Sequence, residues 1–419
     1  MIEPDVPVES VEAFQLRARA WLAENMPRAV DTELSAVDID IERWQRERRL
    51  QRKLYDGGFA GLCFPTAYGG QGLPYTYQQA FDQEAVDYDL PFYIDVPTLG
   101  IIGATILEFG TEEQKQRYLP AMLRGEEIWV QMLSEPTGGS DLASVMTRAT
   151  RQDDGFVVTG SKIWTSGCYA ADYGLCVTRT NWDVPKHDGI TVLIVKLDQP
   201  GVTVERIVGV RGDREFCQEF FNEVRVPVGN VLGDVDAGWT VVRGLLAHER
   251  DSMGGSSRYV SSIKMPFRGP RTAAFEHAIA AGSTRDPRVR QLVAEAHVMG
   301  LVQQQTSERV ARAMEKGQLS PHAGALLRLM GARHGVRRSD IALEIAGVSA
   351  ASWQPGDSLA GAGQFFIGRQ GAELGGGSTE MQRNIISERV LEMPREVAAD
   401  RGVPFKEVRH NAMPMRRGR

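Results

Sequence analysis

Hydrophobic residues recur with a helical period over the first part of the chain. The segment from Asp38 to Gly57 is charged on one side, and two glycines end it. Its apolar residues form a partial stripe made of Ile39, Ile41, Trp44, Leu50 and Leu54. Thr111 to Glu113 supplies a hydroxyl cap and early acids for a second helix, which ends near Gly125. The first ~125 residues are therefore predicted to be helical.

The pattern changes at Ile128, where short β-rich runs separated by turns begin and continue to about Val231. The clearest runs are Phe156 to Thr159, Ile190 to Leu197, Val202 to Val208 and Phe216 to Val226. Runs of this length and spacing predict an antiparallel barrel or sandwich of about a hundred residues.

Helical periodicity returns at Gly238. Asp286-Pro287 is a helix cap followed by a first-turn proline, and the helix that begins there is expected to reach Gly317. Ser320-Pro321 has the same arrangement and predicts the start of the next helix. The glycine-rich stretch 347–377 is expected to be looped in part, and a last helix follows Ser378-Thr379. The predicted class is α+β, with an N-terminal helical domain (1–127), a β-domain (128–235), a C-terminal helical bundle (236–397) and a tail (398–419).

Composition supports an ordinary globular enzyme. The chain has 419 residues, enough for two or three domains, with 42% apolar and 24% charged residues. The net charge is -6 and the basic residues are spread out, so we expect neither a nucleic-acid partner nor a membrane surface. We see no apolar run of ~18 residues and no leader pattern.

The four cysteines contain no CxxC pair, which disfavours a zinc site and a disulfide framework. We therefore expect no metal, and a reducing cytoplasm as the compartment.

Two stretches carry candidate chemistry. The stretch from Trp129 to Asp141 predicts a strand that runs into a turn with two glycines and two hydroxyls, where free N–H groups could meet a flat or anionic ligand. Gly160 to Gly167 places Trp164 beside hydroxyls at a strand end, where it could flank an aromatic ring system. Taken singly, a plain loop and a core tryptophan are the commoner explanations.

Together these stretches resemble the acyl-CoA dehydrogenase family. The resemblance is carried by Phe109-Gly110-Thr111-Glu112-Glu113, Leu133-Ser134-Glu135-Pro136, Lys162-Ile163-Trp164 and Glu380-Met381-Gln382-Arg383-Asn384. It is dense over residues 108–250 and 375–395, and the order of the three domains also agrees. The resemblance implies a C-terminal four-helix bundle and FAD-dependent α,β-dehydrogenation of an acyl-CoA thioester to the trans-2-enoyl thioester.

The resemblance also assigns residues. Cofactor contacts are implied for Gln131, Met132, Leu133, Ser134, Gly139, Ser140, Trp164, Thr165, Ser166, Ser378, Thr379 and Glu380. Within this set Ser134 lies near the ring, Ser140 borders the thioester, Trp164 packs beside the ring and Ser166 reaches flavin N5. Thr379-x-x-Gln382 reads as a capping box that opens the last helix.

The reaction needs a base for the α-proton. Many family members carry a glutamate at the position of Gly376, which has no side chain here. The isovaleryl and long-chain members place it on the first bundle helix, and Glu249-Arg250 stands at the matching place. On such a helix Glu249 shares a face with Val242, Leu245, Leu246 and Met253. Burial there would raise the pKa of a base, although an ion pair with Arg250 or Arg243 is the alternative.

Arg250 and Gly376 are expected to contact substrate, with Gly376 offering only its N–H to the thioester carbonyl. Two family features are missing. Residues 258–271 offer Met265 to Pro270 where an Arg-x-x-Phe-Gly segment is expected, and residues 344–350 lack the glutamine–glycine–glycine segment. Both losses weaken the case for an ordinary homotetramer.

Three hypotheses therefore stand. The first is a dehydrogenase that acts on a CoA or carrier-protein thioester and passes electrons to an electron-transfer flavoprotein. The second is a flavin oxidase or monooxygenase acting on a nitro or amino compound. The third is a partner-dependent subunit of a hetero-oligomer; at least a dimer is expected in every case.

Overall fold

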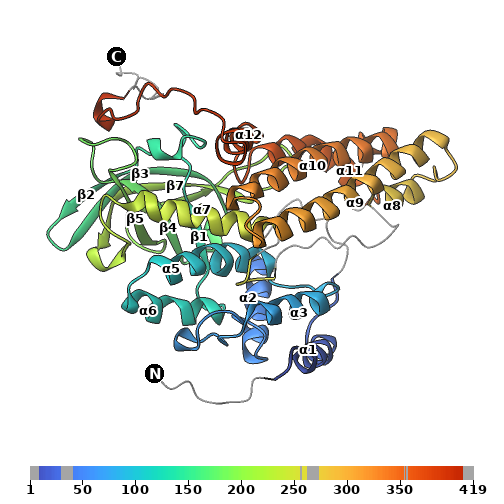
Figure 1. Cartoon of the computed structure of the whole chain (residues 1–419), viewed down its shortest axis with the longest axis horizontal. Helices are drawn as coiled ribbons and strands as arrows, with labels where there is room; N and C mark the ends of the chain where they lie inside the picture. The colour runs from blue at the N-terminus through green and yellow to red at the C-terminus, as the bar shows by residue number, and fades with distance from the viewer. Residues whose placement is uncertain are drawn as a thin grey trace.

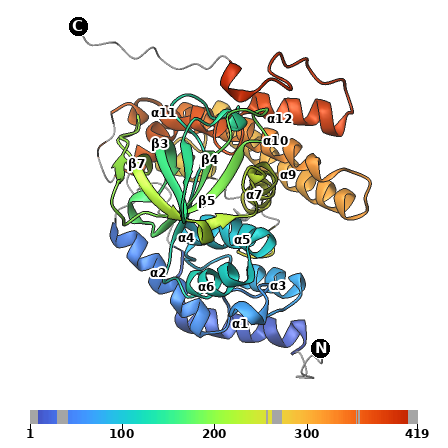
Figure 2. The ribbon, with the colours of Figure 1, turned by 90° about the vertical axis from the view of Figure 1, so that its left-hand side faces the viewer.

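The computed structural model describes residues 9–29, 41–254, 257–261, 273–352, 354 and 357–408. Helices from the first part of the chain form one end of the molecule, the sheet lies beside them, and the later helices project away from both (Figure 1). The view at right angles shows α7 beside the sheet and above α5 (Figure 2). The predicted α+β class, with helices before and after a β-domain, is confirmed.

The N-terminal helices enclose an apolar core of their own. They are α1 Val11–Asn25, α2 Ile41–Asp56, α3 Tyr75–Ala85, α4 Phe92–Asp95, a π-helical segment Val96–Gly103 (η3), α5 Ala104–Phe109 and α6 Glu112–Leu123. The predicted stripe of α2 buries Trp44, Leu50 and Leu54, whereas Ile41 is half-exposed and Ile39 lies outside the described residues. Thr111 forms the capping box that opens α6.

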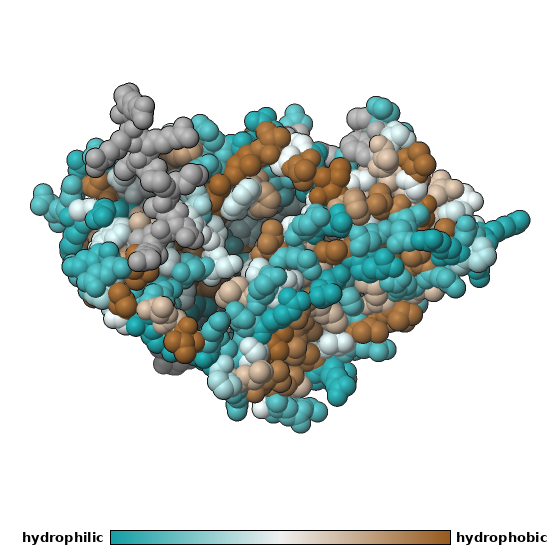
Figure 3. Space-filling view, turned by 90° about the horizontal axis from the view of Figure 1, so that it is seen from above, coloured by the Kyte–Doolittle hydropathy of each residue, from teal (hydrophilic) through white to brown (hydrophobic). Residues whose placement is uncertain are grey.

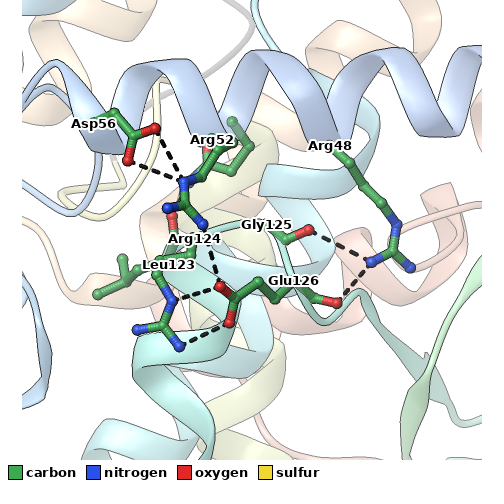
Figure 4. A network of polar contacts seen from close by, with 8 residues as sticks. Arg48, Arg52, Asp56, Leu123, Arg124, Gly125 and Glu126 are labelled. Carbon is green, nitrogen blue, oxygen red and sulfur yellow. Dashed lines mark hydrogen bonds and ion pairs between the residues drawn. The ribbon is translucent and has the colours of Figure 1, made fainter.

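A polar network joins α2 to the turn that follows α6 (Figure 4). Glu126 accepts hydrogen bonds from Arg52 at 3.2 Å and from Arg124 at 2.8 Å. Arg48 donates to the main-chain oxygens of Gly125 and Glu126. Because these groups hold the end of α6 against α2, the side chains that α2 directs inward have a fixed position.

The β-domain is one eight-stranded sheet in the order β6-β7-β3-β2-β4-β5-β8, with β1 paired to β4. Its strands are β1 Trp129–Met132, β2 Arg148–Gln152, β3 Gly155–Ser166, β4 Tyr173–Arg179, β5 Ile190–Lys196, β6 Val202–Arg206, β7 Phe216–Pro227 and β8 Val231–Leu232. Most pairs are antiparallel as predicted. However, β4 runs parallel to β1 and to β2, so the sheet is mixed.

The C-terminal helices are α7 Gly238–Gly254, α8 Ala273–Ala280, α9 Pro287–Glu315, α10 Gly324–Ala346, α11 Ala360–Gly368 and α12 Thr379–Ile385. As predicted, Asp286 caps α9 by accepting from the next two free N–H groups, and Pro287 occupies the first turn. The second predicted cap is also confirmed, since Ser320 caps a short 3-10 turn that leads into α10. The glycine-rich stretch is only partly looped and contains α11.

The core beneath the candidate site is shared by all three parts of the chain. Val241, Val242 and Leu245 of α7 are fully buried in a cluster with residues of η3, β4 and β5. Met253, predicted to lie on the same buried stripe, is 58% exposed. That prediction was wrong because Ser252, and not Met253, occupies the buried side of α7 in its last turn.

Residues 398–408 return to the β-domain. Phe405 is fully buried, with the Arg179 guanidinium 3.9 Å from its ring centroid, and Lys186 forms an ion pair with Asp400 at 2.6 Å. These contacts fix the described part of the predicted tail on the sheet.

Within the described part of the chain, Phe92–Phe109 is the one helical stretch with the length and mean hydropathy of a membrane span. Because 61% of it is buried against the rest of the protein, we interpret it as a core helix.

Candidate active site

Glu249 lies in the next-to-last turn of α7, partly buried where this helix meets β1 and α10. Burial raises the pKa of its carboxyl, and this effect outweighs Arg250, the nearby side-chain amide of Gln131, and Arg328, which all lower it. A carboxyl with a raised pKa in such a place is a candidate general base. Arg250 and Arg328 thus act on this carboxyl electrostatically, whereas no ion pair joins Glu249 to a cation among the described residues.

Gly376 lies directly opposite this carboxyl. Its φ of +65° is a left-handed conformation that glycine adopts without strain. A Cβ added here would lie 3.7 Å from Glu249 Oε1. The structure therefore brings together the two positions at which the resemblance allows a base, one on α7 and one before α12.

Arg328 is a neighbour of this pair that the sequence did not reveal. It extends from α10, and its Nη2 donates to the main-chain oxygens of Ala372, at 2.9 Å, and of Gly375. Its Nε lies 3.2 Å from the Cβ position at Gly376. Burial lowers the pKa of Arg328, and Glu249 opposes that shift. Arg328 thus fixes the loop before Gly376 and places positive charge beside the base.

The loop after β1 is held by a buried ion pair. Lys162, fully buried, donates to Glu135 Oε1 at 2.7 Å and to the Leu133 oxygen at 3.0 Å. Glu135 also accepts from the N–H groups of Met146, at 2.6 Å, and Thr147, at 2.9 Å. Both charged residues occur in the segments that resemble the family, but their mutual contact could not be read from sequence. It anchors the loop that carries Ser134 and Ser140.

The end of β3 presents its side chains alternately to solvent and to the core. Trp164 is 56% exposed and has a φ of 67°, at a register shift between β3 and β7. Ser166 is exposed on the same strand. Thr165 is buried and donates to Glu219 at 2.8 Å. The predicted cofactor contact of Thr165 therefore cannot come from its hydroxyl, because that hydroxyl faces the core.

Among the residues of β1 and the loop that follows it, some side chains are buried and others are exposed. Met132 is fully buried inside the β-domain, so only its main chain is free for a ligand. Gln131 Oε1 is buried and has no hydrogen-bond partner among the described residues. Gly139 and Ser140 are exposed, while Leu133 packs partly against the shared core. Ser134 lies beside β3, since its main-chain oxygen accepts from Ile163 N–H at 2.9 Å.

The start of α12 corrects one prediction. Its N-cap is Ser378, which accepts from Met381 N–H, and not Thr379, which is buried. Gln382 is buried and donates to the oxygens of Gly376 and Gly377 instead of closing a capping box. Among the described residues, the segment 378–380 makes no direct hydrogen bond to β1 or β3. The carboxyl of Glu249 nevertheless lies between Gly376, just before this segment, and Gln131 of β1.

These features fit a planar, hydrogen-bonding ligand such as a flavin. The exposed Trp164 offers an aromatic edge or face, and Ser166 offers a hydroxyl beside it. The buried Gln131 Oε1 lacks a donor, which a ligand N–H or hydroxyl could supply. No group of three metal-ligating side chains occurs within the ranges that the structure describes.

Of the two segments that depart from the family pattern, Met265 to Pro270 lies outside the described residues. The other segment is the end of α10. There Glu344 accepts from Arg288 at 3.0 Å and from Arg337 at 3.2 Å. This position is therefore committed to helix–helix ion pairs on the surface.

Fold and site define an oxidoreductase of the acyl-CoA dehydrogenase class, and comparison with known proteins establishes the family. The N-terminal domain of acyl-CoA dehydrogenases matches residues 9–126, the middle domain matches 131–224 and the C-terminal domain matches 236–391. The chain belongs to the acyl-CoA dehydrogenase family. Members of this family are generally flavin-dependent.

Among named relatives, the acyl-CoA dehydrogenase IpdE1 of Mycolicibacterium smegmatis is 31% identical, over 92% of this chain and 99% of its own. Among solved structures, the Tcur3481-Tcur3483 steroid ACAD has a TM-score of 0.73 at 27% identity, covering 94% of this chain and 100% of that one. The ChsE4-ChsE5 complex from Mycobacterium tuberculosis has a TM-score of 0.70 at 26% identity, with the same coverage.

Proposed function

We propose that this protein binds FAD and dehydrogenates an acyl-CoA thioester at its α and β carbons, with Glu249 as the base. The observation that carries the proposal is the 3.7 Å separation between Glu249 Oε1 and the Cβ position of Gly376. A position on α7 and a position in the turn before α12 thus converge on one spot, where the α-carbon of a substrate would lie. When bound, FAD accepts the hydride that leaves the β-carbon.

The protein's own groups have separate tasks in this proposal. The raised pKa of Glu249 suits a carboxylate that takes the α-proton. The Gly376 N–H has no acceptor among the described residues, so it can donate to the thioester oxygen as negative charge develops there. Arg328 holds the main chain that leads into that N–H in place through Ala372 and Gly375.

The proposed cofactor contacts are those that the geometry leaves accessible. They are the side chains of Gln131, Ser134, Trp164 and Ser166, the main chain of Met132, Leu133 and Thr165, and the exposed Gly139 and Ser140. Contacts by Ser378, Thr379 and Glu380 at the start of α12 complete the proposal. An acyl-CoA, not a carrier-protein thioester, is the first substrate to test because the similar proteins are named acyl-CoA dehydrogenases.

The acyl group is proposed to be bulky. Gly376 leaves the space that a side chain would fill, and one similar solved structure is titled a steroid ACAD. We further propose that an electron-transfer flavoprotein in the cytoplasm accepts the electrons.

Assembly is proposed to involve a second chain. The titles of the two similar solved structures, Tcur3481-Tcur3483 and ChsE4-ChsE5, each name two proteins. Exposed apolar side chains are present in the C-terminal part of the chain, namely Val298, Val302, Phe365, Ile367 and Leu374. In the view from above, apolar residues break up the polar surface over this part of the molecule (Figure 3). Such surface is typical of subunit contacts.

The test is an anaerobic titration of the purified, FAD-loaded protein with steroid-side-chain and branched acyl-CoA thioesters. The proposal expects the flavin absorbance to bleach with at least one thioester and no oxygen to be consumed in air. A protein that takes up no FAD, alone or co-expressed with neighbouring dehydrogenase chains, would contradict it. Light scattering of the loaded protein should show at least a dimer, and a flavin-loaded monomer would refute the assembly proposal.

A further inference from the structure

The described end of the chain, residues 398–408, lies against the loop that joins β4 to β5. This segment follows α12 and reaches across to the sheet (Figure 1). The Phe405 N–H donates to the Val184 oxygen at 2.8 Å, and the Lys406 N–H donates to the Trp182 oxygen at 2.9 Å. Because these bonds join main chain to main chain, they hold the segment in one register against the loop. We refer to residues 398–408 as the C-terminal strap.

Phe405 anchors the C-terminal strap. Its side chain is fully buried, and its ring centroid lies 5.4 Å from that of Trp182 and 3.9 Å from the guanidinium of Arg179. Arg179 is fully buried as well, and its Nε has no hydrogen-bond partner among the described residues. The ring of Phe405 therefore covers a buried cation that would otherwise meet solvent, which makes the contact favourable for both groups.

Arg179 connects this anchor to the loop after β1. Its Nη1 donates to the main-chain oxygen of Lys186 at 2.6 Å, and its Nη2 donates to the main-chain oxygen of Ala143. Ala143 follows Ser140 by three residues. The guanidinium that Phe405 covers thus fixes one end of the segment that carries Ser140.

Lys186 makes a second connection. Its side chain is only 16% exposed, and its Nζ forms ion pairs with Asp400 of the C-terminal strap at 2.6 Å and with Asp141 at 2.9 Å. Burial lowers the pKa of Lys186, but the two acids more than offset this effect, so the pKa lies above its ordinary value. The side chain therefore stays charged between the two carboxylates. Asp141 is the residue directly after Ser140.

Ser140 has no such contacts of its own. It is exposed, as is Gly139 before it, and it forms no hydrogen bond with any residue that the structure describes. Its position therefore depends on the residues that follow it, Asp141 and Ala143, which Lys186 and Arg179 hold. A segment held in this way becomes mobile when its few fixed points are released.

We propose that the C-terminal strap positions Ser140 for the acyl-CoA thioester by acting through Arg179 and Lys186, an inference that rests on the function proposed above. Without the strap, Arg179 loses the ring that covers it and Lys186 loses one of its two acids. Their hold on the loop then weakens, and the loop has to be ordered when the thioester binds. Ordering one residue in this way lowers an affinity on the order of 10-fold.

The experiment is an anaerobic stopped-flow series on the full-length, FAD-loaded protein, together with any partner chain that co-purifies. The probes are CoA thioesters with steroid-side-chain or branched acyl groups. The concentration dependence of flavin reduction gives the dissociation constant, and its plateau gives the limiting rate. Calorimetry with the same thioesters gives the dissociation constant when no reduction occurs.

Phe405→Ala, which releases the C-terminal strap, and Lys186→Met, which removes its link to Asp141, should each raise the dissociation constant on the order of 10-fold. The limiting rate should stay within a few-fold of the parent, because Glu249 and Gly376 lie on α7 and in the turn before α12. Lys186→Arg should restore most of the affinity, since a guanidinium can also bridge two carboxylates.

Controls separate positioning from general stability. Glu407→Gln changes an exposed acid of the C-terminal strap that forms no ion pair with the described residues, and it should alter neither quantity. Hydrogen exchange of the amides of residues 137–144, measured without ligand, should be faster in Phe405→Ala and Lys186→Met than in the parent and in Glu407→Gln. Because Lys186 is not part of the core, Lys186→Met keeps the test valid if Phe405→Ala does not fold.

The outcomes distinguish this inference from the proposed function. If thioesters reduce the parent flavin and both variants keep the parent dissociation constant, the inference is wrong and the proposed function stands. The inference is also wrong if the limiting rate falls as much as the affinity, or if Lys186→Arg binds no better than Lys186→Met. If thioester affinity depends on Phe405 and Lys186 but no thioester reduces the flavin, the inference stands and the proposed function is wrong. A parent protein that binds no thioester overturns both.

Discussion

Lys162→Met should weaken the fold locally and by a large amount. Removing one partner of a buried ion pair typically costs about 3–5 kcal/mol, since the other charge is left buried and unpaired. Here Glu135 would lose its 2.7 Å contact with Lys162 and keep only the N–H groups of Met146 and Thr147. The double variant Lys162→Met/Glu135→Gln should recover part of the loss, because it removes both charges.

The pair also predicts a pH dependence. Burial alone would raise the pKa of Glu135, but Lys162 and the two donors more than offset it, so the pKa is held below 4.5. A carboxyl whose pKa is lowered by folding stabilises the fold above its unfolded pKa and loses that contribution as the pH falls through the folded value. In Lys162→Met the pKa should rise, so the loss should begin at higher pH.

Thermal unfolding followed by circular dichroism measures the overall effect, and hydrogen exchange of the Met146 and Thr147 amides measures the local one. Lys406→Met, which removes an exposed ion pair with Asp183, is the matched control and should leave both unchanged. The reasoning would be refuted if Lys162→Met unfolded at the parent temperature and both amides exchanged at the parent rate.

Two further predictions concern the base. The rate of flavin reduction should fall as the pH is lowered through the raised pKa of Glu249, because only the ionised carboxylate accepts a proton; a rate that stays flat down to pH 4.5 would argue against it. Gly376→Glu placed in a Glu249→Gln background should restore part of the lost rate, because its Cβ would lie 3.7 Å from the position of the original Oε1. The positive φ at residue 376 and the nearby Arg328 should keep the rescue incomplete. Stopped-flow flavin reduction measures the rescue, with Gly376→Ala in the same background as the control.

Local patterns predicted much of the fold. Side-chain caps at Thr111, Asp286 and Ser320 act within a few residues of their own position, so the sequence alone contains the necessary information. The parallel pairing of β4 with β1 joins segments 44 residues apart and depends on how the chain crosses the domain, which no local pattern records. The same limit explains why Met253 was assigned to the core.

Some residues of the candidate site could likewise be found from the sequence, and others could not. Glu249 stood out because the resemblance places a base at this position and because an acid on an apolar face is unusual within one helix. Arg328 and Gln382 did not stand out in the sequence. Their roles depend on hydrogen bonds to main-chain oxygens of the loop before α12, and these bonds form only in the folded chain. Thr165 was assigned to the cofactor with its neighbours, whereas strand alternation places its hydroxyl toward Glu219.

The most direct test of the account is anaerobic stopped-flow reduction of the flavin by an acyl-CoA thioester in Glu249→Gln. The substitution is nearly isosteric, so FAD content and thioester affinity should match the parent protein. The rate should drop by on the order of 10²–10⁴-fold, the usual contribution of a positioned general base. Glu276→Gln, which changes an exposed carboxyl on α8 outside the proposed site, should stay within a few-fold of the parent. Parent-rate reduction in Glu249→Gln would contradict the account.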